Sequence, residues 1–257
     1  MRGAYDGRVS IARSIFMSRL VFALLVASTF SAHAASPADH FDYQHQSEWH
    51  AVHDAFQSPI DIHTADAVAV DEDEPDAVQP HYGMLAGMVV DTGHALQVNV
   101  PGGDAKIRGR RFVLRQFHFH AHSEHTIDAK LFPAEVHLVH VAKDGRMAVI
   151  GVMLEEGAAN PALDAVLKAA RKGEAHEVPA IRPADLLPKS DAYYHYLGSL
   201  TTPPLTENVE WYVLKQPITA SPAQLDALRS FYADNFRQPQ PLEGRVVTQF
   251  DPAAPKK

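Results

Sequence analysis

The sequence predicts a single domain of the mainly β (α+β) class, built around a large, mostly antiparallel twisted sheet with a few short peripheral helices. Polar and apolar residues alternate with a period of two in several segments, which is the pattern of strands that bury one face. Another segment is apolar throughout. Only two segments carry the start signals and the apolar spacing of a helix. The 257 residues, 46% of them hydrophobic, suffice for one large core.

Strands with one buried face are expected, in chain order, at residues 95–100 (ALQVNV), 112–120 (FVLRQFHFH), 135–142 (EVHLVHVA) and 208–214 (NVEWYVL). Residues 147–154 (MAVIGVML) have no polar face. A strand of that composition is expected at the centre of the sheet, where both of its faces are covered.

Helices are expected at two places. The segment 160–173 (NPALDAVLKAARKG) opens with an Asn-Pro pair, repeats its apolar residues at helical spacing and stops at Gly173. The segment 221–232 (SPAQLDALRSFY) opens on Ser221, and Gln224 is placed to close a capping box with it.

The N-terminal residues 1–34 have the features of a removable secretory signal. Arg13 and Arg19 precede the apolar run 20–30, which is too short to span a bilayer as a mature helix. Small residues at 32–34 (AHA) supply a cleavage site. We therefore expect a secreted, periplasmic protein whose mature domain, residues 35–257, has no membrane contact once the signal is removed. The alternative interpretation of the same segment is an uncleaved membrane anchor.

Charge and cysteine content narrow the possible partners and the sources of stability. The formal net charge of −8 argues against a nucleic-acid partner, which would require a basic face. The chain has no cysteine, so its stability must rest on the core or on a bound metal rather than on disulfides.

Four histidines and a glutamate fall within residues 116–125 (QFHFHAHSEH). On a strand, His118 and His120 share one face, and His137 on the segment 135–142 can face the same point. Three neutral imidazoles form a ligand set that leaves zinc an open position for water. Gln116 and Glu135, each two residues from a histidine on the same face, are suited to accept the second ring N–H of a metal-bound imidazole.

Two other interpretations fit the same spacing. Buried histidines are often hydrogen-bonded core residues without any metal. Alternatively, His118, His120 and Glu124 with a later histidine match the ligand set of a cupin barrel, which would favour iron or manganese. Spacing alone does not decide between these and a zinc site.

Six segments together resemble the α-class carbonic anhydrases, in particular those of the bacterial secreted type. They occur in the family's order and extend from about Phe41 to Phe250, nearly the whole mature chain. This resemblance decides against the cupin. The segments are QSPIDI (57–62), GHALQV (93–98), QFHFHAHSEHTID (116–128), AEVHLVHV (134–141), GSLTTPPLTENVEW (198–211) and DNFRQPQPLEGR (234–245). One departure is Phe41, where a tryptophan is usual.

The resemblance implies a role for each matching position. The zinc ligands would be His118, His120 and His137, whose ring N–H groups would be accepted by Gln116, the backbone carbonyl of Asn235, and Glu135. Thr201 would stand beside the zinc-bound solvent, Glu124 would accept the Thr201 hydroxyl proton, and His94 would pass protons to the outside. Carbon dioxide would rest on an apolar wall opposite a polar side. The wall would comprise Val139, Val149, Leu200, Val209 and Trp211, and the polar side Thr202, Tyr43, Gln97 and Tyr196.

The implied activity is the zinc-dependent, reversible hydration of carbon dioxide to bicarbonate and a proton by a zinc-bound hydroxide, which is the reaction of a carbonic anhydrase, a zinc lyase. Sulfonamides and anions are the expected inhibitors, and the protein is expected to be a monomer or a homodimer. The contrasting class is a binding module, either an inactive relative or a zinc-storage protein. Inactive relatives typically lose a ligand, whereas all three histidines are present here.

Overall fold

We describe the fold from a computed structural model, which places residues 41–70 and 78–252. The predicted signal segment and its junction with the mature domain lie outside these residues. Within them, none of the helices is long and apolar enough to cross a membrane.

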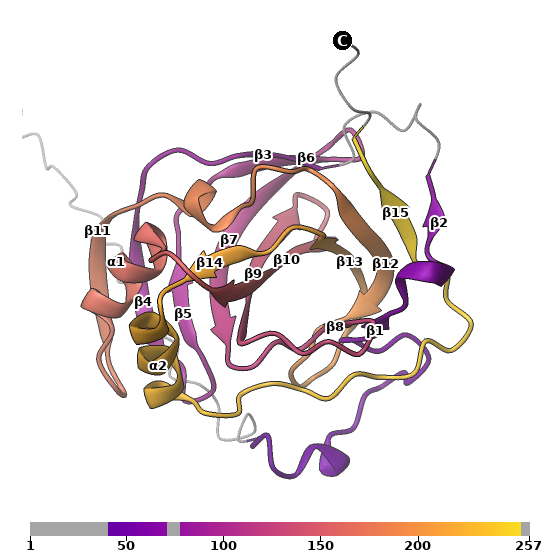
Figure 1. Cartoon of the computed structure of the whole chain (residues 1–257), viewed down its shortest axis with the longest axis horizontal. Coiled ribbons are helices and arrows are strands. Elements are labelled where there is room, and N and C mark those ends of the chain that lie inside the picture. Colours follow the sequence, from indigo (N-terminus) through magenta and orange to yellow (C-terminus); the bar gives the residue numbers. More distant parts are fainter. Residues whose placement is uncertain (1–40, 71–77, 253–257) are drawn as a thin grey trace, which may run out of the picture. The chain divides into compact units, whose positions relative to one another are not determined.

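One large mixed sheet carries the fold (Figure 1). Among the described residues it has 13 strands, whose main path runs β11-β4-β5-β7-β9-β10-β13-β12-β15-β2. In chain order the strands on or beside this path are β2 (Val68–Ala69), β3 (Val78–His81), β4 (Leu85–Asp91), β5 (Leu96–Asn99), β6 (Asp104–Ile107), β7 (Arg110–His120), β9 (Ala134–Ala142), β10 (Met147–Glu156), β11 (Ala175–Ile181), β12 (Tyr193–Ser199), β13 (Glu207–Leu214), β14 (Ile218–Ala220) and β15 (Thr248–Phe250). Two short strands, β1 (Asp61–Ile62) and β8 (Thr126–Ile127), pair separately.

Most neighbouring strands are antiparallel, as the sequence predicts. The parallel pairs of the main sheet are β10 with β13, β10 with β14 and β15 with β2. Strand β10 is therefore flanked by the antiparallel β9 on one side and the parallel β13 on the other. Seven consecutive residues of β10 are buried, which confirms the central, doubly covered strand expected at 147–154.

The four alternating segments are strands β5, β7, β9 and β13. Strand β7 begins two residues earlier than predicted, at Arg110, and its pairing with β9 contains a β-bulge between Leu114 and Gln116. This bulge lies just before the histidine segment, and from Gln116 to His120 the alternation is regular.

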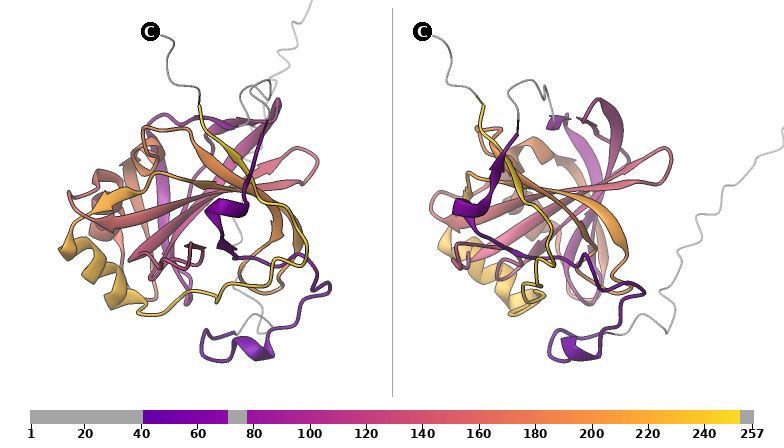
Figure 2. Two further views of the ribbon diagram at one scale, coloured as in Figure 1. Left: turned by 45° about the vertical axis from the view of Figure 1, so that its right-hand side comes forward. Right: turned by 90° about the vertical axis from the view of Figure 1, so that its right-hand side faces the viewer.

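Both predicted helices form, next to each other at the β11-β4 side of the sheet (Figures 1 and 2). Helix α2 (Pro222–Phe231) has the predicted capping box of Ser221 and Gln224. Helix α1 (Pro161–Ala169) ends four residues short of the predicted stop at Gly173. The reason is a side-chain cap: Arg171 Nη1 donates to the carbonyl oxygens of Lys168 at 3.0 Å and Ala170 at 2.7 Å, so the helix end does not need the glycine.

The two faces of the sheet pack into two apolar clusters. The larger cluster holds Phe117 and Phe119 of β7 and Leu138 of β9, together with residues of both helices. The smaller cluster holds Val149 of β10 and Trp211 of β13. Because side chains alternate along β7 and β9, the histidines predicted as ligands lie on the face of the smaller cluster.

Candidate metal centre and active site

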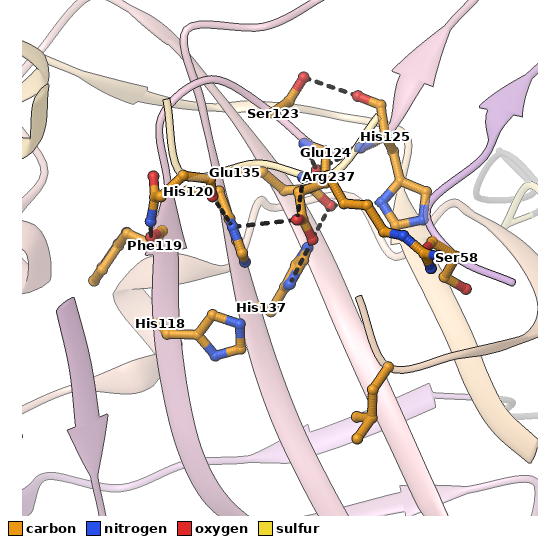
Figure 3. A network of polar contacts seen from close by, with 12 residues as sticks. Ser58, His118, Phe119, His120, Ser123, Glu124, His125, Glu135, His137 and Arg237 are labelled. Atoms are coloured by element: carbon orange, nitrogen blue, oxygen red, sulfur yellow. Dashed lines mark hydrogen bonds and ion pairs between the residues drawn. The ribbon is translucent and has the colours of Figure 1, made fainter. Parts of the chain in front are cut away.

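Three histidines converge on the sheet, two from β7 and one from β9 (Figure 3). His118 is the direct cross-strand partner of His137, and His120 follows two residues later on the same face. The ring centroids are 4.9 Å (118 to 120), 5.2 Å (118 to 137) and 4.5 Å (120 to 137) apart. One nitrogen of each ring lies within 4.8 Å of the other two, so a single ion can be reached by all three.

Each ring has one nitrogen engaged by an acceptor. His118 Nδ1 lies 2.8 Å from Gln116 Oε1, His120 Nδ1 lies 2.6 Å from the Asn235 carbonyl oxygen, and His137 Nε2 lies 2.8 Å from Glu135 Oε1. Since the acceptors take the ring N–H groups, the lone pairs remain on His118 Nε2, His120 Nε2 and His137 Nδ1. His120 Nε2 is buried and has no hydrogen-bond partner among the described residues, as expected for a metal-facing nitrogen. The residues therefore fit a metal ion.

Burial keeps these imidazoles neutral. It lowers the pKa of His120 to about 4 and lowers the pKa values of His118 and His137 as well. A neutral imidazole offers the lone pair that a metal needs. The pKa of Glu135 would be raised by burial, but His125 and His137 hold it well below its ordinary value, so this carboxylate is ionised.

Glu135 serves two histidines at once. Its Oε1 atom is 2.8 Å from His125 Nδ1 as well as 2.8 Å from His137 Nε2, and its Oε2 atom accepts from the backbone N–H groups of Glu124 and His125. Gly151, the cross-strand partner of His137 on β10, leaves room for this carboxylate: a Cβ atom there would lie 2.9 Å from Glu135 Oε1.

His125 was not predicted as a site residue. Its Nε2 atom lies 2.7 Å from the Tyr196 hydroxyl, which is also 2.9 Å from Ser58 Oγ. Hydrogen bonds thus connect Glu135 through His125 to Tyr196 on β12 and to Ser58 in the segment before β1. The adjacency of His125 to Glu124 in the motif was an available signal, but Tyr196 is 71 residues away and no periodicity links the two.

Glu124 lies fully buried behind the triad (Figure 3). Its Oε1 atom accepts the backbone N–H of Arg237 at 2.8 Å, and its Oε2 atom is 3.8 Å from His137 Nδ1. Burial raises the pKa of Glu124 to about 7, while His137, the Thr201 hydroxyl and the Arg237 N–H favour the ionised form. The structure thus places the Thr201 hydroxyl close enough to the Glu124 carboxylate to lower its pKa. Arg237, which sequence reasoning missed, donates to Gln57 Oε1 and Ser58 O and so holds its own segment in place.

The predicted apolar wall is one continuous surface. Val139 and Val149 are cross-strand partners on β9 and β10, and Val149 is in turn the partner of Trp211 on β13. Val209 shares the Trp211 face, and Leu200 packs against the same cluster. Trp211 Nε1 donates to the Ser199 carbonyl at 2.9 Å, and its ring centroid is 4.8 Å from that of His137, so the wall borders the triad.

The remaining predicted residues lie at different depths. Thr202 is half-buried beside Thr201, and Gln97 is the cross-strand partner of His118. The pKa of Tyr43 is raised well above its ordinary value, mainly by burial and also by the nearby charge of Glu124. His94 is outside the triad, in the loop between β4 and β5, with its ring stacked on Phe41 at 3.9 Å. The expectation for Tyr196 is wrong: it is 1% exposed and lies behind the site, because its hydroxyl is engaged by His125 and Ser58.

The chain is similar to several known proteins over most of its length. A carbonic anhydrase of Pectobacterium carotovorum is 37% identical over 245 residues, covering 89% of this chain and 98% of its own. The solved α-carbonic anhydrase of Thermovibrio ammonificans, in complex with sulfanilamide, is 42% identical with a TM-score of 0.72, covering 76% of this chain and 87% of its own. A carbonic anhydrase of Chlamydomonas reinhardtii in complex with acetazolamide is 35% identical with a TM-score of 0.73, covering 84% and 99%. The sequence model of the eukaryotic-type carbonic anhydrases matches residues 43–251, and the chain belongs to this family of enzymes.

Proposed function

We propose that this protein hydrates carbon dioxide reversibly to bicarbonate and a proton, with one Zn²⁺ held by His118, His120 and His137. One observation carries the proposal: three imidazole lone pairs converge while the other nitrogen of each ring is engaged by an acceptor. Three neutral nitrogen ligands suit zinc and leave a fourth position open. When bound, zinc supplies a hydroxide nucleophile at neutral pH, because it lowers the pKa of coordinated water to about 7, a value known from carbonic anhydrases themselves.

Thr201 and Glu124 give the nucleophile a direction. In its ionised form Glu124 can only accept hydrogen bonds, so the Thr201 hydroxyl would then donate its proton to it. The Thr201 oxygen is then left as an acceptor toward the site. This acceptor would take the proton of a nucleophile in the site and so would orient the lone pairs of that nucleophile away from Thr201.

The wall suits the substrate because carbon dioxide is apolar and has little capacity for hydrogen bonding. Val139, Val149 and Trp211 would hold the molecule without binding the charged product equally well. His94 would pass the proton of each turnover to solvent, since the ordinary pKa of histidine, about 6.5, is close to that of the donor.

Stopped-flow measurement of carbon dioxide hydration, combined with zinc analysis, tests the proposal. The purified protein should contain one tightly bound zinc per chain, lose activity on chelation and regain it when zinc is restored. His137→Ala should lose both zinc and activity, because two imidazoles hold the ion far less well than three. Activity that survives chelation would refute the proposal, and several weak zinc sites without activity would indicate zinc storage instead.

Two further properties belong to the same proposal. Sulfonamides should bind at the metal, a proposal supported by the relatives solved in complex with sulfanilamide and acetazolamide. Export to the periplasm, proposed from residues 1–34, would be tested by fractionating the producing cells and sequencing the mature N-terminus.

A further inference from the structure

Asn235, in the segment between α2 and β15, makes hydrogen bonds inside the protein through its backbone carbonyl and through both polar atoms of its side chain. Its backbone carbonyl accepts from His120 Nδ1 at 2.6 Å, and its side-chain Oδ1 accepts from the Ala121 N–H at 2.8 Å. The side-chain Nδ2 donates to the carbonyl oxygens of Phe119 and His94, both at 3.0 Å. The residue is 3% exposed. Only the backbone carbonyl was expected to have a role.

The side chain of Asn235 connects the loop before β5 with the residue that follows β7. Strands β5 and β7 are paired as far as Leu96 and Phe119, and continuing this antiparallel register would place His94 opposite Ala121. Instead, the Ala121 N–H donates to Asn235 Oδ1, and Asn235 Nδ2 donates to the His94 carbonyl. The carboxamide is therefore inserted between the two strands where their ladder ends. It links the backbone of His94 to the end of the strand that carries His120.

A second contact fastens the same loop from α2. Asp91, at the end of β4, accepts hydrogen bonds from the Tyr232 hydroxyl through Oδ1 and from the Gly173 N–H at 2.8 Å through Oδ2. Tyr232 is the C-terminal cap residue of α2. The loop of residues 91–95, here called the His94 loop, is thus held at Asp91 by Tyr232 and at His94 by Asn235. Figure 1 shows α2 beside β4 and β5, where these contacts are made.

We propose that Asn235 is a positioning residue for proton transfer, because its carboxamide fixes the His94 loop relative to the metal ligands. This inference rests on the proposed function, in which His94 passes protons. Proton transfer requires groups within hydrogen-bond reach, directly or through water, so a loop free to move would spend less time in transfer geometry. Carbon dioxide capture does not involve His94 and should be insensitive to the loop.

Asn235→Ala is the main variant, since it removes the carboxamide and keeps the backbone carbonyl that His120 uses. In dilute buffer kcat should fall on the order of tenfold, less than the roughly 10²-fold that a ~1 Å misplacement of reacting groups can cost. The ratio kcat/KM should stay within about twofold, one zinc per chain should remain, and imidazole should restore kcat. Hydrogen exchange of the amides at 91–96 should accelerate, an effect that does not depend on turnover.

Two more variants make the test specific. Tyr232→Phe removes the other anchor without replacing any residue bonded to a ligand, and it should give a smaller change of the same kind even if Asn235→Ala does not fold. Asn160→Ala removes a comparably buried asparagine, the cap of α1, and should lower stability without altering exchange at 91–96 or kcat.

The outcomes separate this inference from the function on which it rests. If His94→Ala lowers kcat but Asn235→Ala and Tyr232→Phe do not, the positioning role is wrong and the proton route stands. If kcat and kcat/KM fall together in Asn235→Ala with zinc still bound, the residue supports the ligands rather than His94. If His94→Ala itself has no effect on kcat, the proposed proton route fails and this inference fails with it.

Discussion

His137 and His140 lie three residues apart on β9, and their side chains leave the strand on opposite faces. His137 joins the metal triad, whereas His140 is buried in the larger core, with Nε2 2.5 Å from the Tyr82 hydroxyl and Nδ1 3.3 Å from the Ala148 carbonyl. On one strand, therefore, one histidine belongs to the metal triad and another is part of the core. The core histidine, His140, makes the stability of the protein depend on pH.

Burial lowers the pKa of His140 to about 4. Between pH 4 and the ordinary value of about 6.5, the unfolded chain binds a proton at this position that the folded chain excludes, so stability should fall as the pH is lowered through that range. The contribution is roughly 3 kcal/mol over the full range. His140→Gln, which removes the titratable ring and keeps a side chain that can donate and accept hydrogen bonds, should make the pH dependence of urea unfolding shallower by about this amount. His53→Gln, at an exposed position, is the control and should leave the curve unchanged.

His125→Ala tests the shared carboxylate. The change leaves Glu135 with one imidazole donor instead of two and empties a fully buried site. Loss of a partner that orients a ligand typically lowers metal affinity by about 10-fold to 100-fold. Zinc affinity measured by competition with a chelator should fall by that order. An unchanged affinity in a folded variant would show that His137 is oriented by Glu135 without help from His125.

Thr201→Ala should leave zinc in place and slow hydration by roughly 10²-fold to 10³-fold, as when one oriented transition-state contact is removed. Thr201→Ser keeps the hydroxyl and should be much milder. Steady-state hydration kinetics on both variants provide the comparison. Equal losses in the two would mean that the position acts through packing alone.

His94→Ala should lower kcat in dilute buffer, leave kcat/KM for carbon dioxide nearly unchanged and respond to added imidazole. Proton transfer directly to water from a group of pKa near 7 is limited to about 10³ s⁻¹, because recombination at ~10¹⁰ M⁻¹s⁻¹ is multiplied by an acid constant near 10⁻⁷ M. The proton leaves after bicarbonate, so substrate capture is unaffected. A parallel fall of both parameters without rescue would assign His94 a structural role.

The alternation of side chains along strands predicted the site as far as the strands extend. It placed His118, His120 and His137 on one face, because a strand whose two faces differ chemically shows a period of two in its sequence. The apolar wall with Val139 and Trp211 was implied only by the resemblance to the family. It did not reveal β12, whose segment YYHYLGS has tyrosines on both faces, so that neither face is uniformly polar or apolar.

The contacts behind the ligands could not be predicted in the same way. Asn235 lies 114 residues from Ala121, in a segment without regular structure, and Ser58 reaches Tyr196 over 138 residues. No local sequence pattern indicates contacts between residues so far apart in the chain. The end of α1 was missed for a related reason: the stop comes from the reach of the Arg171 side chain, while the pattern pointed to the nearest glycine.

The space at Gly151 has a consequence for sequence variation and redesign. The Glu135 carboxylate that occupies it cannot step aside cheaply, since four hydrogen bonds hold it. Position 151 would therefore accept very few residues in a saturation library, although it bears no reactive group and lies on the strand next to the ligands. Among homologues or engineered variants, a residue other than glycine at position 151 would indicate that Glu135 no longer holds His137 in place, even where all three histidines are present in the sequence.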